Sequence, residues 1–583
     1  MPRVTSWRRL ILRVAAGLLL LLVVVFSYQV VRTVLSLRDA KNEAHQLGAE
    51  LRRNDVAAVK QTLRDLEERS ATARGLSDNI LWDAASKVPY LGDDIGAVQV
   101  MAHALNDASA RVYEPAVALL EKSGNNTLRD SDGRVQLAAV AELEKPLDQM
   151  ATALQGAADE VDELDPDHLL GPLRDVTTNV QNQLDASLSA AKGGATVARL
   201  VPPMMGADGS RRYLLVVQNN AETRSTGGLP GSFAVLDAVD GKLSLGAQRA
   251  VDDFDILTAP VLPLTDEERA LYGDNLGENI RDTNLTPDFP RAASLMSALQ
   301  KRSFGTDIDG IISVDPVLLS SVLRATGPVM VGEERFTAGN VVRKLLNEVY
   351  QRVDTREAQD AYFDGAARGI FNSLVTRNVE PLKLFRALGK SASQRRFLVW
   401  SSHAEEQELI AGTVSSGELP RDTGAEPHVG LYLNDGTAAK IEYYLDYETS
   451  IRSASCTTKG AQKLQVGMVL SSSAPRRGYQ LSRFITGRGL YAPRGMMRLN
   501  LRIYAPTGGE LTTLTANGKA VKIVTNDHDG RQVAIVTMLI RAHQQVRLSA
   551  EFRTRDGQRG DPVLDWTPGV RTRTSTVTAS SAC

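Results

Sequence analysis

A short polar stretch between two apolar runs holds the residue types best suited to chemistry. Residues 213–217 and 233–236 are short runs rich in β-branched and aromatic side chains, typical of buried strands. Glycines 227, 228 and 231 allow the backbone between these runs to approach a ligand closely. Polar loops that join core strands are often functional. The stretch therefore predicts a ligand-binding loop, with an ordinary tight surface loop as the alternative. Its candidate side chains are Asn219, Asn220, Arg224, Ser225 and Thr226, with Glu222 beside them.

Further arginines and carboxylates follow in the same region. A guanidinium group can bind two phosphate oxygens at once and always keeps its charge. Clustered carboxylates suit a hard cation such as Mg²⁺. This combination fits a pyrophosphate site, where catalysis depends mainly on positioning and charge neutralisation. The alternative for each arginine is a solvated face or a local ion pair. We predict a site that also uses Arg249, Arg281, Arg352 and Arg356, with Mg²⁺ held by Asp252 and Asp253.

Histidine placement limits the other kinds of chemistry. The chain has seven histidines, and none lies between Arg211 and Arg396. A Ser-His-Asp triad or a histidine-ligated metal in this region would need a residue from a neighbouring domain. We therefore set both aside.

Three motifs in this region resemble a known family. They are QNNAETRSTGGLPGSFAVL, RDTNLTPDFPRAASLM and DGIISVDPVLLSSVLRATGPV. Together they are similar to the bacterial membrane-anchored family known as domain of unknown function 4012. The order of elements also resembles that of the LytR-CpsA-Psr family, phosphotransferases that attach lipid-pyrophosphate-linked glycopolymers to the cell wall.

The second resemblance implies roles for particular residues. Arg224-Ser225-Thr226 is similar to an Arg-Ser-Asp-Thr motif of the phosphotransferases, with the aspartate missing. Arg249 and Asp252 match the arginine and aspartate that follow their next strand, which implies Arg224, Arg249 and Asp252 as catalytic residues. Arg352 and Arg356 resemble a later Arg-x-x-Arg-Gln helix motif. The missing aspartate argues against metal binding and catalysis.

The N-terminal segment predicts a membrane anchor. Residues 14–31 carry no charge, and Arg3, Arg8, Arg9 and Arg13 precede them. We expect a cytoplasmic N-terminus at 1–13, a transmembrane helix at 14–34 and an exported remainder, which describes a single-pass protein of the cell membrane and envelope. A cleaved signal peptide is the alternative, but no small-x-small cleavage site follows the segment.

The remainder divides into helical, mixed and β-rich regions. Residues 35–200 have helical periodicity and predict a helical stalk or bundle, with a partner-binding coil as the alternative. Alternating strands and helices at 208–415 predict an α/β domain, similar to LytR-CpsA-Psr domains by the resemblance above. Seven or so short strands at 427–583 predict a β-sandwich.

Composition excludes some classes of partner and site. The 583 residues include 67 Lys and Arg against 69 Asp and Glu, so charge gives no reason to expect nucleic-acid binding. Cys456 and Cys583 can form one disulfide or remain two free thiols. A structural zinc site is not expected with so few cysteines.

Two hypotheses of function follow. In the first, the protein is an envelope enzyme or handler that binds a lipid-pyrophosphate-linked glycopolymer through the arginine-lined site, with or without transferring it, and the membrane and cell-wall glycan are its partners. In the second, it is a non-catalytic envelope scaffold or binding protein. Converging arginines in a pocket favour the first, and a filled core with scattered arginines favours the second.

Overall fold

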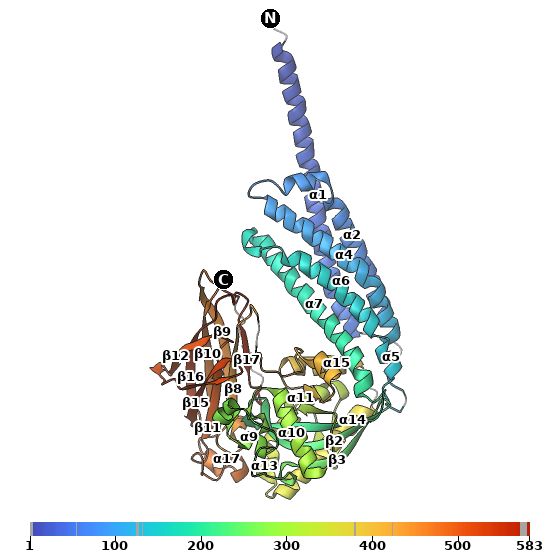
Figure 1. Ribbon diagram of the computed structural model, residues 1–583. Helices are drawn as coiled ribbons and strands as arrows, with labels where there is room; N and C mark the ends of the chain where they lie inside the picture. Colours follow the sequence, from blue (N-terminus) through green and yellow to red (C-terminus); the bar gives the residue numbers. More distant parts are fainter. Residues whose placement is uncertain are drawn as a thin grey trace. The chain divides into compact units, whose positions relative to one another are not determined.

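The chain folds as two compact units in a computed structural model (Figure 1). The first unit contains Met1–Ser131 with Val135–Ala207, and the second contains Asp132–Arg134 with Asp208–Cys583. The structure describes residues 4–53, 55–123, 128–130, 132–377, 381–421, 424–571 and 580–583.

The described elements of the first unit are helices, apart from an isolated β-bridge between Arg129 and Val135. Alanine-rich faces let its long helices approach closely, and Trp82, Met101, Ala157 and Val161 are buried in its core. Asp55 caps α2 by accepting a hydrogen bond from the Ala58 N–H at 3.0 Å. The elements are α1 (Val4–Arg53), α2 (Val56–Ser77), α3 (Ile80–Ala85), α4 (Gly92–Ser123), α5 (Leu137–Ala141), α6 (Glu144–Asp162), η1 (Pro166–His168) and α7 (Gly171–Met204).

The predicted transmembrane helix requires a correction. Residues 14–34 lie within α1, yet no helix in the described part of the chain is long and apolar enough to span a membrane. Residues 14–20 and 23 of the predicted span lie outside those whose side chains are described. The predicted cytoplasmic N-terminus, export and single-pass localisation rested on this helix and are withdrawn with it.

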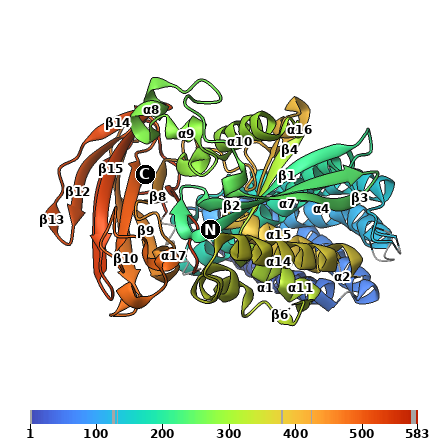
Figure 2. The same ribbon diagram turned by 90° about the horizontal axis from the view of Figure 1, so that it is seen from below.

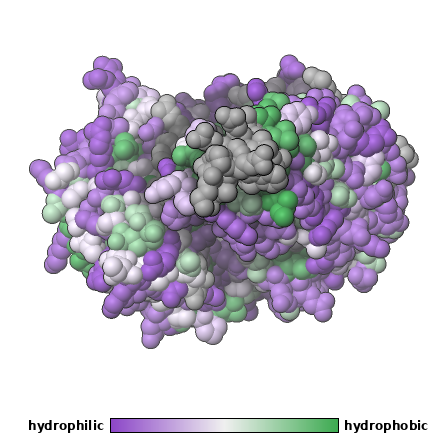
Figure 3. Space-filling model, turned by 90° about the horizontal axis from the view of Figure 1, so that it is seen from above, coloured by the Kyte–Doolittle hydropathy of each residue, from purple (hydrophilic) through white to green (hydrophobic). Residues whose placement is uncertain are grey.

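Exposed apolar side chains do occur on α1, including Leu21, Val24, Tyr28 and Val31. The face of the molecule in Figure 3 is mainly hydrophilic, with small groups of hydrophobic residues.

A mixed sheet forms the centre of the α/β part of the second unit. Its strand order is β3-β2-β1-β4-β7, and only the β1–β4 pairing is parallel among these described strands. Asp240 and Gly241 both have positive φ in the tight turn between β2 and β3. The strands are β1 (Arg211–Arg224), β2 (Gly227–Val239), β3 (Lys242–Ala250), β4 (Gly310–Val314) and β7 (Leu398–Ser401).

Helices cover both faces of this sheet, as Figure 2 shows. Leu214 and Val216 pack with Met296 of α10 (Phe289–Phe304), whereas Leu215 and Val217 pack with Leu318 on the other face. That opposite face is covered by α11 (Pro316–Thr326), α14 (Arg356–Thr376) and α15 (Pro381–Ser393). Alternate side chains of β1 therefore contribute to two hydrophobic cores, one on each face of the sheet.

Short elements complete the α/β part. They are η2 (Val251–Asp253), α8 (Asp266–Tyr272), α9 (Asn275–Glu278), η3 (Thr283–Leu285), β5 (Val329–Val331), β6 (Glu334–Phe336), α12 (Val341–Arg343), η4 (Lys344–Glu348), α13 (Val349–Arg352) and α16 (Ala404–Ile410).

The C-terminal part of the second unit is a pair of packed sheets. One has the order β13-β12-β16-β10-β9 and the other β14-β15-β11-β8-β17, with Leu433, Val466, Met468 and Leu501 buried in one shared core. The elements are β8 (His428–Asp435), η5 (Ile441–Tyr444), β9 (Leu445–Cys456), β10 (Gln462–Ser472), η6 (Gly478–Gln480), α17 (Arg483–Thr486), β11 (Met497–Tyr504), β12 (Glu510–Ala516), β13 (Lys519–Ala520), β14 (Thr525–His528), β15 (Arg531–Ile540), β16 (Gln545–Arg553) and β17 (Val563–Trp566).

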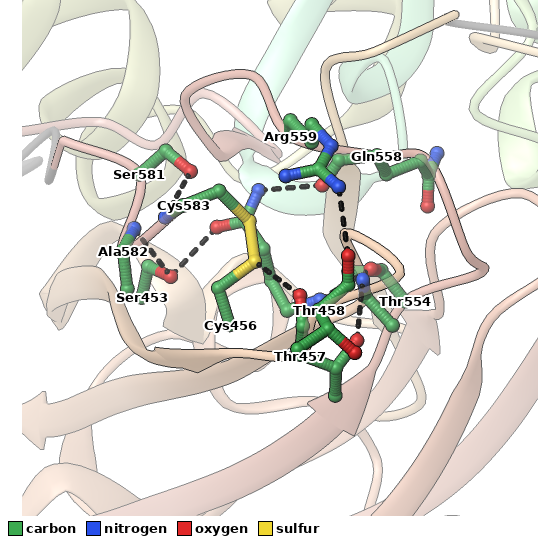
Figure 4. Close-up of a disulfide and its surroundings, with 12 residues drawn as sticks. Ser453, Cys456, Thr457, Thr458, Thr554, Gln558, Arg559, Ser581, Ala582 and Cys583 are labelled. Carbon is green, nitrogen blue, oxygen red and sulfur yellow. Dashed lines mark hydrogen bonds between the residues drawn. A yellow bond between two sulfur atoms is a disulfide. The ribbon is translucent and has the colours of Figure 1, made fainter.

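A disulfide joins Cys456, at the end of β9, to Cys583 (Figure 4). Beside it, the Ala582 N–H donates to Ser453 Oγ at 3.1 Å. The C-terminal residues are thereby tied to the sandwich, and the alternative of two free thiols is set aside.

Candidate functional site

The predicted ligand-binding loop is a strand, a tight turn and a second strand. β1 continues to Arg224 and β2 begins at Gly227, so Ser225 and Thr226 make the connection. A Cβ atom added to Gly228 would lie 2.2 Å from the carbonyl carbon of Asn219. This glycine is needed because two strands approach closely, so the predicted irregular loop is wrong, whereas ligand binding by its residues stays a prediction. Polar residues suggested a loop, but internal hydrogen bonds allow them to be buried in strands.

Gln218 and Asn284 bond several polar groups of the turn, although Asn284 Oδ1 and Thr223 Oγ1 have no hydrogen-bond partner among the described residues. Gln218 Oε1 accepts hydrogen bonds from the Gly228 N–H at 2.7 Å and Thr226 Oγ1 at 3.2 Å. Asn284 Nδ2 donates to Thr226 Oγ1 at 3.0 Å and to the Gly228 carbonyl at 2.8 Å. Thr226, a predicted ligand-binding residue, is thus engaged within the protein.

Ser225 connects the α/β sheet to the sandwich. Its Oγ donates to the Leu285 carbonyl at 2.6 Å, and its N–H donates to Asn434 Oδ1 at 3.1 Å. Asn434, in β8, donates back to Ser225 Oγ at 2.9 Å. Thr567, just after β17, donates to the Ser225 carbonyl at 3.1 Å. Ser225 therefore makes hydrogen bonds across the junction of two β structures.

The two predicted asparagines are also buried at this junction. Asn219 Nδ2 donates to the Tyr350 hydroxyl at 2.6 Å, and its Oδ1 accepts from the Ala221 N–H at 3.0 Å. Asn220 Nδ2 reaches the Pro568 carbonyl at 3.5 Å. Internal bonding gives Asn219 a structural role, whereas Asn220 Oδ1 is buried with no hydrogen-bond partner among the described residues.

Arg224 is held by neighbouring carboxylates. The residue is 7% exposed, and its Nη1 donates to the Thr223 carbonyl at 3.1 Å. Its Nη2 lies 3.5 Å from Asp282 Oδ1 and 4.0 Å from Glu222 Oε1. Burial raises the pKa of Asp282 even though the charge of Arg224 opposes this effect. Both Nη atoms of the guanidinium therefore face protein groups, whereas its buried Nε has no hydrogen-bond partner among the described residues.

Glu222 extends this group of charges into the sandwich. Its Oε2 lies 2.9 Å from Lys440 Nζ. Burial acts to raise the pKa of Glu222, but the charges of Lys440 and Arg224 outweigh it and leave this pKa below its usual value. An ionised pair thus joins β1 to the residue that precedes η5.

Arg281 and Arg356 do come together, on Asp252. Both guanidinium groups form ion pairs with this carboxylate. The Arg281 side chain is 31% exposed and that of Arg356 is 61% exposed. Burial, followed by the nearby charge of Arg356, lowers the pKa of Arg281. Two arginines that share one carboxylate on the surface have the charge and the hydrogen-bond donors needed to bind an anion.

The remaining predicted residues make other contacts, although Asp253 directly follows Asp252 in η2. Arg249 stacks over the Phe304 ring at 4.5 Å, and Arg352 lies 3.8 Å from Glu334 with its side chain 65% exposed. Asp253 accepts a hydrogen bond from the Ala250 N–H at 2.8 Å. In the described ranges, no three His, Cys, Asp or Glu side chains gather as a metal ion requires, and Mg²⁺ stays a prediction.

Residues 208–350 match a family model described as protein of unknown function (DUF4012). The chain thus contains a DUF4012 region. This confirms the family resemblance of the three motifs, all of which lie within that range. The resemblance to the LytR-CpsA-Psr family stays a prediction. Among curated proteins, none matches the chain.

Several important partners of the DUF4012 region lie outside it and were not predicted. Lys440 and Asn434 come from the sandwich, 218 and 209 residues from Glu222 and Ser225 respectively. The short sequence Asn434-Asp435-Gly436 indicates a turn, but no sequence signal pairs it with Ser225.

A buried pair of carboxyl groups lies next to this junction. Burial and the neighbouring Asp435 raise the pKa of Glu442 well above its usual value. Asp435 itself accepts hydrogen bonds from the N–H groups of Thr437 at 2.6 Å and Ala438 at 2.7 Å. The DUF4012 region thus contacts a sandwich surface that carries several buried ionisable groups.

Proposed function

We propose that the protein is a non-catalytic binding protein for a glycopolymer. In this proposal, the DUF4012 motif joins the α/β sheet to the sandwich and performs no phosphoryl transfer. The burial and pairing of Arg224 carry the proposal, since this residue corresponds to the phosphotransferase arginine in the sequence resemblance.

Energetics support a structural role for Arg224. To contact a phosphate, its guanidinium would have to leave Asp282 and Glu222 in a buried environment. Breaking a buried ion pair typically costs about 3–5 kcal/mol. The sequence also lacks the aspartate of the Arg-Ser-Asp-Thr motif. Both observations favour binding without transfer.

The choice of a glycopolymer rests on the resemblance to the LytR-CpsA-Psr family. It concerns the class of ligand and not the reaction, because Arg224 is buried against protein carboxylates and the aspartate of the motif is missing. Arg224 is buried at the sandwich, whereas Arg249 stacks on Phe304.

Phosphoryl transfer remains the second candidate because of Arg281 and Arg356. Their convergence on Asp252 at the surface favours an anion site of the type that a lipid pyrophosphate requires. Asp252 is also the residue implied as catalytic by the resemblance.

The test uses the full chain with a polyprenyl-pyrophosphate-linked oligosaccharide and an acceptor glycan, with and without Mg²⁺. We expect the oligosaccharide to bind and no polyprenyl phosphate to be released above the protein-free rate. Release that is lost in Arg281→Ala and Arg356→Ala would establish the second candidate. Absence of any binding would reject both.

A further inference from the structure

The disulfide lies where three segments of the sandwich meet (Figure 4). Cys456 ends β9, and Cys583 is held there together with Ala582, whose N–H donates to Ser453 Oγ at 3.1 Å. The third segment is the connection from β16 to β17, at residues 554–562. Cys583 is exposed and Cys456 is half-buried, so a reductant in solution can reach the bond.

Gln462 links the residues beside the disulfide to this connection. Its Oε1 accepts a hydrogen bond from Ser453 Oγ at 2.6 Å. Its Nε2 donates to the carbonyls of Gln558 and Gly560, both at 2.7 Å. The hydrogen bonds of Gln462 thus run from the segment that the disulfide holds to the middle of the connection.

A second link is direct. The Ser581 N–H, two residues before Cys583, donates to Asp561 Oδ1 at 2.7 Å. Asp561 lies two residues before β17, a four-residue strand at the edge of its sheet. Within the described sheet, β17 pairs with β8 alone. Because an edge strand has a partner on one side only, contacts of the connection contribute directly to holding the start of β17.

The buried side chain of Gln558 favours opening of the connection. The residue is 0% exposed, yet neither its Oε1 nor its Nε2 has a hydrogen-bond partner among the described residues. Figure 4 shows no hydrogen bond to this amide from the residues drawn. A buried polar group without a partner carries a free-energy cost, which water would remove if the connection opened. The links to the disulfide oppose this opening.

Asp565 connects β17 to a cleft of about 830 Å³ in the second unit. Its carboxylate lies 3.3 Å from Arg395 Nη1 and 3.3 Å from His428 Nδ1, and all three residues line the cleft. Arg395 has a φ of 56°, in the left-handed region that a non-glycine residue adopts only where its surroundings hold it. Movement of β17 would remove one of the contacts that hold this wall of the cleft.

We propose that the Cys456–Cys583 disulfide is a redox switch: a dithiol reductant opens it, which releases residues 554–562 and the start of β17 and loosens one wall of the cleft. The inference is independent of glycopolymer binding. A thiolate of the reductant attacks Cys583 Sγ, the S–S bond breaks, and Cys456 leaves as a thiolate that takes up a proton. The second thiol of the reductant then attacks the mixed disulfide, which frees Cys583 as a thiol and leaves the reductant as a disulfide.

The experiment measures hydrogen–deuterium exchange of the full chain before and after treatment with dithiothreitol in the absence of denaturant. Thiol titration follows the reduction. The matched internal control is β14, which is also a four-residue edge strand and lies at the opposite edge of the same sheet. Asp561→Ala removes the acceptor for Ser581 while the disulfide stays intact. Its control is Asp527→Ala, at another exposed aspartate, in β14.

We expect reduction to raise exchange at residues 557–567 by about tenfold or more, and exchange in β14 by less than about twofold. Cys583→Ser should show the raised exchange without reductant and no further change with it. Asp561→Ala should raise exchange at the same residues with the disulfide intact, whereas Asp527→Ala should not. Reoxidation should restore slow exchange in the parent protein.

Three results would overturn the switch. The first is unchanged exchange at residues 557–567 after complete reduction. The second is a disulfide that dithiothreitol does not reduce unless denaturant is present. The third is an equal rise of exchange in β14, which would show general destabilisation. Where Cys583→Ser fails to fold, reduction of the folded parent protein still decides between these results and the expected one.

Discussion

Lys440 Nζ and Glu222 Oε2 lie 2.9 Å apart, although the two residues are separated by 218 positions in the sequence. The pair connects the central sheet to the sandwich next to the turn of the DUF4012 motif. Its side chains are 19% and 9% exposed, so water screens their interaction only weakly. The junction therefore depends on charge pairing as well as on apolar packing.

Removing one partner of this pair should be strongly destabilising. Lys440→Met leaves the buried Glu222 with only the more distant Arg224, at 4.0 Å, and we expect the free energy of unfolding to fall by about 3–5 kcal/mol. Urea unfolding measures the change. Arg212→Met is the matched control, because its pair with Asp237 is much more exposed and should contribute under about 1 kcal/mol. Similar losses in the two variants would contradict a special role for the buried pair.

The carboxyl pair Asp435 and Glu442 predicts a pH dependence of stability. Burial and Asp435 raise the pKa of Glu442 in the folded state above its usual value of 4.5, so the folded chain holds a proton that the unfolded chain releases. The stability from this group is fully present below pH 4.5 and is lost as pH rises toward the folded-state pKa. The slope is at most about 1.4 kcal/mol per pH unit.

Glu442→Gln tests this sign, because glutamine does not titrate. Between pH 5 and 8, urea unfolding should show the stability of the variant rising relative to that of the parent protein as pH increases. Glu510→Gln, at an exposed position, serves as the control and should leave the pH slope unchanged. Identical pH slopes for Glu442→Gln and the parent would refute the prediction.

The disulfide between Cys456 and Cys583 should stabilise the sandwich. The two residues are 127 positions apart, and a crosslink over a long loop limits the freedom of the unfolded chain. Reduction, or Cys583→Ser, should lower the free energy of unfolding by about 2–4 kcal/mol. Reductant should have no further effect on Cys583→Ser. If the parent is equally stable with and without reductant, the crosslink does not stabilise the fold.

Local signals in the sequence predict many of the elements. The apolar alternation at 213–217 corresponds to part of β1, and Asp315-Pro316 predicts the start of α11. The Asp315 side chain accepts a hydrogen bond from the Leu318 N–H at 2.7 Å, as expected of a helix cap. Thr265 and Glu268 form a capping box at α8. These signals depend only on residues close together in the chain.

The candidate site was less predictable because its contacts are distant in the sequence. Asn219, Ser225 and Arg224 have polar side chains, which favour a loop when only neighbours are considered. Their partners Tyr350, Asn434 and Asp282 provide the hydrogen bonds that make burial favourable. A single sequence contains no signal for such pairings. Arg281, Arg356 and Asp252 belonged to one larger predicted cluster, and ion pairs join these three residues in the structure.

Arg224→Ala tests the structural role of Arg224 most directly when its free energy of unfolding and its binding of polyprenyl pyrophosphate in detergent micelles are measured on the same preparation. We predict a loss of about 3–5 kcal/mol in stability, since Asp282 and Glu222 lose a buried partner, and unchanged binding. Arg224→Lys should restore part of the stability because it keeps the charge. An Arg224→Ala variant of unchanged stability that binds polyprenyl pyrophosphate about tenfold more weakly would contradict the structural role of Arg224.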